Sequence, residues 1–345
     1  MAANDPVDID ISIFNSEPLP RPSAAAYLKH LLLLALTFCT ATIAGTLFPF
    51  GPGSSFLEET SETESVVSTS LSLPFTYAQA VVKAVHDIFT DPATLAYGLK
   101  FSLSLLFILI CHEMGHYIAC RIYRVEATLP FFIPTPPMVG PAGTFGAFIK
   151  IQSPMPSRKA VFDIGVAGPI AGFIALIPIA IAGFATLEFG TEADIVAGNI
   201  LPIDFSQPLF MKLASVISGA NMDLPMVQNP FYFAAWVGLL VTALNLIPSG
   251  QLDGGHAIYA ALGETVHKWT GRIAFVVMAV LSIVGFLFFN SPSGFLITII
   301  LGIMMRVPHP RPWDQRPLDT KRRAVALLTL LIFILCFVPF PIRIN

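Results

Sequence analysis

Charged residues are scarce in this chain. Asp, Glu, Lys and Arg make up 12% of its 345 residues, whereas hydrophobic residues make up 54%. Soluble domains carry about 25% charged residues, so this scarcity excludes an ordinary soluble domain and indicates an integral membrane protein in a lipid bilayer. The net charge is -3, and the sequence has no dense block of basic residues. We therefore expect no nucleic acid among its partners.

Cysteine is also rare, and its placement excludes a disulfide framework. The four cysteines, Cys39, Cys111, Cys120 and Cys336, all lie in or beside apolar segments. The first 26 residues are polar and acidic, and no basic segment leads into a short apolar stretch. We therefore expect a polar cytoplasmic tail over 1–26, no cleaved signal peptide, and a first apolar segment that is retained as an anchor.

Long apolar runs, in contrast, recur along the chain. A hydrocarbon core about 30 Å thick needs roughly 20 apolar residues per helix. Six runs approach or exceed this length, at 31–48, 97–120, 161–187, 231–249, 273–289 and 324–341. A seventh, 294–305, is short enough to be re-entrant instead of spanning.

The distribution of positive charge favours seven spans. With seven spans and a cytoplasmic N-terminus, fifteen of the nineteen Lys and Arg residues fall on the cytoplasmic side. If 294–305 does not span, the six basic residues of 306–323 move to the outer side. We predict an all-α polytopic membrane protein with six to seven transmembrane helices. The outer loops 49–96 and 188–230 are acidic and irregular, and we expect no independent domain in either.

The apolar run 97–120 is interrupted by the string H-E-M-G-H at residues 112–116. On a helix, His112 and His116 share one face and can converge on one ion, while Glu113 projects about 100° round the axis. That is the geometry of a zinc site with a general base. Such a string arises by chance in roughly four of a thousand shuffled sequences of this composition. The alternative is two histidines satisfied by hydrogen bonds between helices.

A catalytic zinc site has three protein ligands, so one more is needed. The best candidate is Asp253, in the stretch N-L-I-P-S-G-Q-L-D-G-G at 245–255, which has no adjacent basic residue. The runs 97–120 and 231–249 cross the membrane in the same direction, so Asp253 and the two histidines fall in the same, cytoplasmic half. The alternative reading of Asp253 is an acid in a turn that ends a helix.

H-E-M-G-H in one membrane helix, followed far downstream by N-x-x-P-x-x-x-L-D-G-G, resembles the site-2 protease family of intramembrane zinc metalloproteases. The resemblance covers about 97–256. It implies one zinc per chain held by three ligands, a glutamate base, and an asparagine that positions substrate or transition state. By motif position these are His112, His116 and Asp253, then Glu113, and then Asn245.

The rest of the chain supports a single domain. Neither its length nor its composition accommodates the PDZ or CBS domain that many members of that family carry, so we expect one metalloprotease domain over 27–345. Gly168, Pro169 and Gly172 resemble a glycine-proline feature of the family, and helix packing explains them equally well.

A short β-hairpin is expected between the second and third spans. Residues 127–153 are rich in Pro and Phe, and 143–151 has the aromatic and β-branched content of a strand. The resemblance implies a sheet that lies partly in the membrane and binds an extended substrate along its edge. The alternative is an ordinary cytoplasmic loop.

Together these features predict an intramembrane zinc metalloprotease that cleaves membrane-spanning protein substrates, placed in the plasma (inner) membrane. Two other classes remain open. One is an ion or proton transporter that uses the intramembrane His, Glu and Asp cluster, and the other is an inactive scaffold of the same fold. Neither the identity of the substrate nor the oligomeric state follows from the sequence.

Overall fold

The computed structural model describes residues 22–47, 49–51, 66–137, 141–190, 203–222, 224, 226–307 and 309–344, so most of the expected tail 1–26 lies outside the described residues. The helices are α1 (Ala24–Thr46), α2 (Val66–Thr90), α3 (Pro92–Ile122), α4 (Arg158–Ala185), α6 (Leu209–Ser218), α7 (Pro230–Asn245), α8 (Asp253–Leu262), α9 (Glu264–Phe289), α10 (Ser293–Met304) and α11 (Thr320–Cys336). The short elements are β1 (Phe131–Pro134), the 3-10 turn η2 (Pro141–Gly143), β2 (Thr144–Phe148), β3 (Ile203–Phe205) and β4 (Ile342–Ile344).

Several helices begin at residues that satisfy their free backbone N–H groups. The Asp91 side chain accepts hydrogen bonds from the first turn of α3, and Asn229 does the same for α7. Both helices then start with proline, which has no N–H to satisfy at that position. Ser157 caps α4 in the same way.

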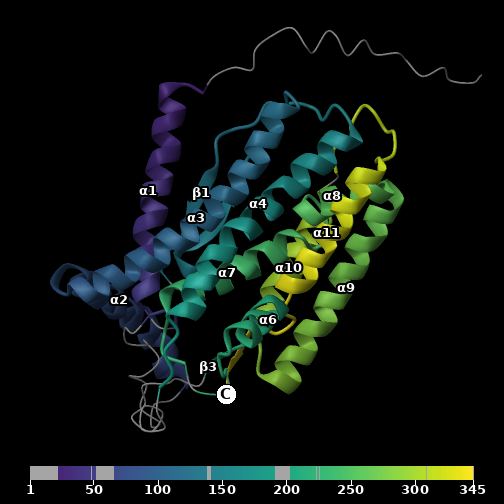
Figure 1. Cartoon of the computed structure of the whole chain (residues 1–345). Coiled ribbons are helices and arrows are strands. Elements are labelled where there is room, and N and C mark those ends of the chain that lie inside the picture. Colours follow the sequence, from purple (N-terminus) through teal and green to yellow (C-terminus); the bar gives the residue numbers. More distant parts are fainter. Residues whose placement is uncertain are drawn as a thin grey trace, which may run out of the picture.

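The bundle is built around α3, α4 and α7, which pack against one another, while α1 and α9 stand at opposite edges (Figure 1). Apolar side chains from these three helices form the main core, for example Leu105, Leu176 and Leu239, each with no exposed surface. Because α3 carries His112 and His116 and α4 packs directly against it, this packing positions the candidate site.

The mainly helical class predicted from the sequence is confirmed. In the part of the chain that the structure describes, four helices, α1, α3, α4 and α9, are long and apolar enough to cross a membrane, and α6, α7 and α10 are shorter apolar helices. The two segments predicted as irregular outer loops contain helices in their described parts, α2 within 49–96 and α6 within 188–230. Small residues hold α2 in place: Ala80 and Ala84 are buried against Leu47.

The predicted hairpin is present between α3 and α4. Strands β1 and β2 pair antiparallel, with Phe131 opposite Phe148 and Phe132 opposite Ala147. A second pair, β3 with β4, joins two segments far apart in the sequence.

The run 231–249 is not one continuous helix. Helix α7 ends at Asn245, a turn follows, and Asp253 is the first residue of the separate helix α8. Pro248 lies in that turn, and a proline disfavours helical geometry at the residue before it. The turn is what brings Asp253 back toward α3.

Candidate metal centre

The two histidines of the motif lie on the inner face of α3. His112, Glu113 and His116 have exposed fractions of only 3%, 5% and 6%. The Nε2 atoms of the two histidines are 3.2 Å apart. Their approach follows from the helical period, since residues four apart lie one turn apart on the same face.

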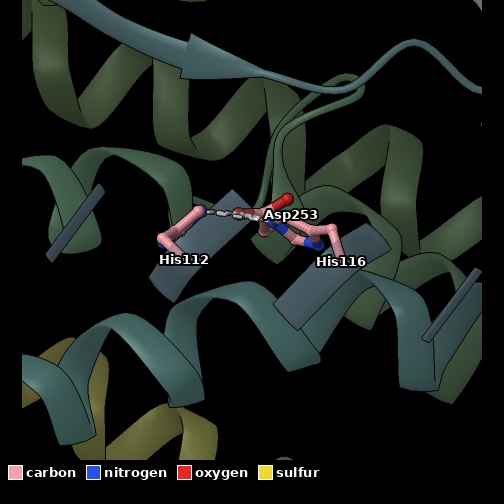
Figure 2. Close-up of side chains that lie close together, drawn as sticks. All are labelled: His112, His116 and Asp253. Carbon is pink, nitrogen blue, oxygen red and sulfur yellow. Dashed lines mark hydrogen bonds and ion pairs between the residues drawn. The ribbon is translucent and has the colours of Figure 1, made fainter. Parts of the chain in front are cut away.

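Asp253 completes a triangle with these histidines (Figure 2). Its Oδ2 atom is 3.2 Å from Nε2 of His112 and 3.3 Å from Nε2 of His116. A tetrahedral ion with bonds of about 2.0–2.1 Å to its ligands holds them about 3.3–3.4 Å apart. The triangle therefore has the size of one face of a zinc tetrahedron. In the described part of the chain, these three residues form the one His, Cys, Asp or Glu group able to hold a metal ion.

The ring of His116 is oriented from its other nitrogen. Nδ1 lies 2.7 Å from the carbonyl oxygen of Ile164 in α4, so Nδ1 carries the proton and donates it. Nε2 is then left with a lone pair that faces Asp253. Metal-binding histidines are commonly held by such a hydrogen bond at the remote nitrogen. Nothing in the residue type of Ile164 reveals this role in the sequence, because the acceptor is a backbone atom.

Two glycines of α4 leave the space that the imidazoles occupy. A Cβ atom added at Gly168 would lie 2.0 Å from Nε2 of His116, and one added at Gly172 would lie 3.1 Å from Cβ of His112. Gly115, on α3 itself, allows close contact with the backbone of Ala167. Helix packing alone, the alternative considered for Gly168 and Gly172, is therefore only part of their role.

Glu113 and Asn245 border the triangle without belonging to it. The Oε1 atom of Glu113 is 4.0 Å from Nε2 of His112, and the carboxylate accepts a hydrogen bond from the backbone N–H of Ile149. The side-chain amide of Asn245, Nδ2, is 3.2 Å from Nε2 of His112. A carboxylate and an amide thus lie beside the triangle, both close to His112.

The turn before Asp253 packs closely against the first residues of α8. Added Cβ atoms at Gly254 and Gly255 would lie 2.0 Å from the carbonyl oxygen of Leu246 and 2.4 Å from that of Gly250. The same Gly250 carbonyl accepts a hydrogen bond from Nε2 of His267 in α9, at 2.9 Å. The L-D-G-G glycines are needed for this backbone contact, and His267 is a supporting residue that sequence reasoning missed.

A cavity of about 550 Å³ opens onto the triangle. Its walls include Glu113, Asn245, His256 and the strand β2 with the residues that follow it. His256 binds the carbonyl of Leu252 through Nδ1 and so lies beside the site without being part of the triangle. Cys111, one residue before the motif, does not belong to the metal-binding group either.

The geometry agrees with comparisons to known proteins. Residues 100–288 match the model of peptidase family M50. The probable zinc metalloprotease EGY1, chloroplastic, of Arabidopsis thaliana is 30% identical over 73% of this chain and 44% of its own length. EGY2 of the same plant is 27% identical over 71% of this chain and 42% of its own length. EGY3 of Oryza sativa subsp. indica is 25% identical over 79% of this chain and 49% of its own length.

This chain therefore spans less than half the length of these curated relatives. The family match covers more than half of this chain, and it includes the H-E-M-G-H helix and the turn that carries Asp253. The resemblance to the site-2 proteases is thereby confirmed, and the chain belongs to peptidase family M50.

Proposed function

We propose that this chain is an intramembrane zinc metalloprotease that hydrolyses peptide bonds in or near membrane-spanning segments of protein substrates. The observation that carries the proposal is the triangle of two Nε2 atoms and one carboxylate oxygen, with sides of 3.2–3.3 Å. His112, His116 and Asp253 are the proposed ligands of one zinc ion per chain, and zinc is also the metal in the names of the relatives. The domain extends over 27–345, with its core at about 97–256.

Glu113 is the proposed general base. The chemistry supplied by bound zinc is Lewis acidity, which lowers the pKa of water toward 7 and polarises a carbonyl. Glu113 removes a proton from the attacking water while the oxygen of that water bonds to the carbonyl carbon of the substrate. Glu113 then delivers the proton to the amide nitrogen, which leaves when the C–N bond breaks. Asn245 donates a hydrogen bond to the substrate backbone or to the oxyanion, a contribution that is about 2.7–4 kcal/mol in other enzymes.

The β1–β2 hairpin offers a strand edge with which an unwound, extended substrate segment can form backbone hydrogen bonds. A helical substrate hides its carbonyls, whereas an extended one can pair with the edge of a sheet. Ala147 and Phe148 of β2 border the same cavity as the triangle. An extended segment added beside β2 would therefore have its backbone next to Glu113 and Asn245.

The proposed topology has seven spans, with the N-terminus and the site on the cytoplasmic side, as the positive-charge rule favours. Helices α7, α10 and α11 are then spans in addition to the four longer ones. For the membrane, the sequence-based expectation is the plasma (inner) membrane, whereas the relatives' names carry the word chloroplastic. Fractionation of the source cells decides between these locations.

The test measures zinc content and cleavage in the same detergent-purified samples, with a generic single-span protein as substrate. Glu113→Gln should retain about one zinc per chain and lose cleavage, because it removes the base but keeps the ligands. Asp253→Ala and His116→Ala should each lose both zinc and cleavage. His86→Ala, a histidine in α2 far from the triangle in sequence, is the matched control and should behave like wild type.

The outcomes separate the candidate functions. Zinc-free wild-type protein, prepared without chelators, would refute the metal site and leave an ion path as the explanation of the cluster. Zinc that is retained while no substrate is cleaved would instead indicate the inactive scaffold. Unchanged zinc in Asp253→Ala would show that the third ligand is another group.

A further inference from the structure

A second and larger cavity lies between α9 and α10; its lining includes Gly250 and His267, which support the turn before Asp253, but none of the three proposed zinc ligands. Its volume is about 890 Å³, within the size range of small-molecule sites. On α9 its walls are formed by residues three and four apart, which place them on one helix face: Glu264, His267, Lys268, Gly271, Arg272 and Phe275. We call this cavity the α9–α10 cleft.

The mouth of the α9–α10 cleft is strongly basic. Lys268, Arg272, Arg306 and Arg311 all border it, with Glu264 as the one acidic residue of the lining. Glu264 pairs with Lys268 at 2.7 Å and with Arg311 at 3.1 Å, so its charge is already shared between two of the cations.

The other two cations, Arg272 and Arg306, have no acidic partner within 4 Å among the described residues. The mouth therefore carries an excess of about three positive charges, counted from formal side-chain charges.

The part of the cleft farther from the mouth, which we call its apolar depth, is an open apolar wall on which Ile299 and Ile303 are 61% and 54% exposed. Phe275 on α9 and Ile299 and Ile303 on α10 line it, and Gly302 leaves room beside the Phe275 ring. Phe275 lies three residues beyond Arg272, which is about 4.5 Å along a helix. The cleft therefore passes from charged groups to hydrocarbon-like surface within about one helical turn.

The basic mouth lies where the polar edge of a membrane is expected. The guanidinium of Arg272 sits over the ring of Trp269, 5.1 Å from its centroid, and Trp269 is 57% exposed. Tryptophan and arginine are enriched at the level of lipid headgroups. Beyond this level the outer face of α9, at the edge of the bundle in Figure 1, is apolar and exposed, for example at Ile273 and Val276.

We propose that the α9–α10 cleft binds one anionic diacyl phospholipid, with its phosphate headgroup between Arg272 and Arg306 and an acyl chain along Phe275, Ile299 and Ile303. Charge complementarity selects the headgroup, because basic pockets between transmembrane helices recognise anionic headgroups. The apolar depth selects a lipid over a soluble phosphate, which has no group to fill it. The site contains none of the three proposed zinc ligands, and the proposal does not depend on proteolytic activity.

The experiment titrates the full chain, purified in a neutral detergent, with dioleoyl phosphatidylglycerol and separately with dioleoyl phosphatidylcholine, and measures retained lipid by native mass spectrometry. The two lipids have the same acyl chains and differ in headgroup charge. The anionic lipid should bind roughly tenfold more tightly or better, because each basic residue near a lipid surface contributes on the order of 1 kcal/mol. Inorganic phosphate at the same concentration should not compete.

Two variants test the two halves of the cleft. Arg272→Gln with Arg306→Gln should reduce affinity for the anionic lipid about tenfold and remove the preference over phosphatidylcholine. Ile299→Trp, which keeps every charge but fills the apolar depth, should weaken both lipids. The matched control is Lys321→Gln with Arg323→Gln, which removes two exposed cations at the start of α11 outside the cleft and should leave both affinities within about twofold.

Several results would overturn the proposal. Equal binding of the two lipids would remove the headgroup selection. An equal loss of affinity for the anionic lipid in the cleft double variant and in the control double variant would show that the lipid is attracted by the total charge of the chain and does not bind a defined site. Competition by inorganic phosphate, together with unchanged binding in Ile299→Trp, would show a simple anion site without an acyl-chain groove. Retention of zinc by each variant checks that the chain has folded.

Discussion

Gly168 leaves the space in which the imidazole of His116, one of the three proposed ligands, lies. It stands where the ring of His116 must pass α4, and the carbonyl that orients this ring, that of Ile164, lies one turn earlier on the same helix. A side chain at position 168 and the imidazole cannot occupy the same volume. The ligand geometry is therefore set jointly by α3 and α4.

Gly168→Ala is expected to reduce zinc affinity at least tenfold, the lower end of the effect seen when groups that orient metal ligands are disturbed. The added Cβ would lie 2.0 Å from Nε2 of His116, so the ring must turn away from Asp253. Zinc content after dialysis against a graded chelator series measures the change. Gly238→Ala, a glycine of α7 that meets only flexible side-chain methyl groups, is the control. Equal zinc affinity in both variants would contradict this role.

At the residue scale, the histidines and the glutamate could be predicted because their arrangement is local. Residues four apart on a helix share a face whatever the surroundings, and His112 and His116 do so. The support around them could not be predicted. Ile164 acts through its backbone and His267 through a bond to Gly250, and neither residue type carries a signal for these roles.

At the scale of elements, the segment between α10 and α11 covers α8 and the start of α9. His309 stacks on Tyr259, with ring centroids 4.0 Å apart, and also lies against His256 and His267. Burial, and then the neighbouring His256, lower the pKa of His309 to about 3, while its hydrogen bond to the Pro310 carbonyl and then Glu264 act in the opposite direction. Its buried Nε2 has no hydrogen-bond partner in the described residues.

The chain should lose stability in acid because of His309. The unfolded chain binds a proton at this histidine as the pH falls through about 6.5, whereas the folded chain does not until about pH 3. Stability from this group is therefore complete above pH 6.5 and declines below it, by at most roughly 1.4 kcal/mol per pH unit.

His309→Phe keeps the ring stacked on Tyr259 and removes the titration. Its apparent Tm should fall less than that of wild type between pH 7.5 and pH 5, as measured by a thermal shift assay in detergent. The variant and the wild type share the site histidines and His256 and His267, so the difference isolates position 309. Parallel falls in the two proteins would show that His309 does not contribute.

Element boundaries were the least predictable feature of the fold. The apolar run 231–249 indicated one span, yet α7 stops at Asn245 and Asp253 opens a new helix. Hydrophobicity does not record this break, because the turn is itself buried, with Ile247 3% exposed and Ser249 0%. The hairpin was predictable in kind, since strand residues follow a proline-rich stretch. The pairing of β3 with β4 was not, because it joins distant segments.

At the scale of the whole molecule, α10 is short for a helix that crosses the bilayer. It has 12 residues, about 18 Å of helix, which is less than the roughly 30 Å of a hydrocarbon core. It follows α9 after Asn290, whose left-handed backbone (φ 48°) ends that helix. The chain after α10 returns to the end of the bundle where α3 ends, because the Arg322 guanidinium contacts the hydroxyl of Tyr123 at 2.9 Å and the carboxylate of Asp163 at 2.6 Å.

Seven spans predict that Asn290→Cys and Arg316→Cys are modified from opposite sides of the membrane. Both positions are exposed, and a membrane-impermeant thiol reagent added to intact or opened vesicles distinguishes the sides. The background lacks the four native cysteines. Arg121→Cys should follow Arg316→Cys, and Lys83→Cys should follow Asn290→Cys. Labelling of positions 290 and 316 from one side would make α10 re-entrant.

The sequence by itself determined that this is a helical membrane protein and that two of its proposed zinc ligands, His112 and His116, share one helix face. Scarce charge and long apolar runs require a helical membrane protein, and H-E-M-G-H places His112 and His116 on one helix face through the fixed period of the helix. Only the tertiary structure decided that Asp253 reaches them, because 136 residues separate it from His116 and the approach depends on a turn, on α8 and on the packing of α3, α4 and α7. The same holds for the α9–α10 cleft, whose basic mouth comes from residues that meet only when those two helices pack.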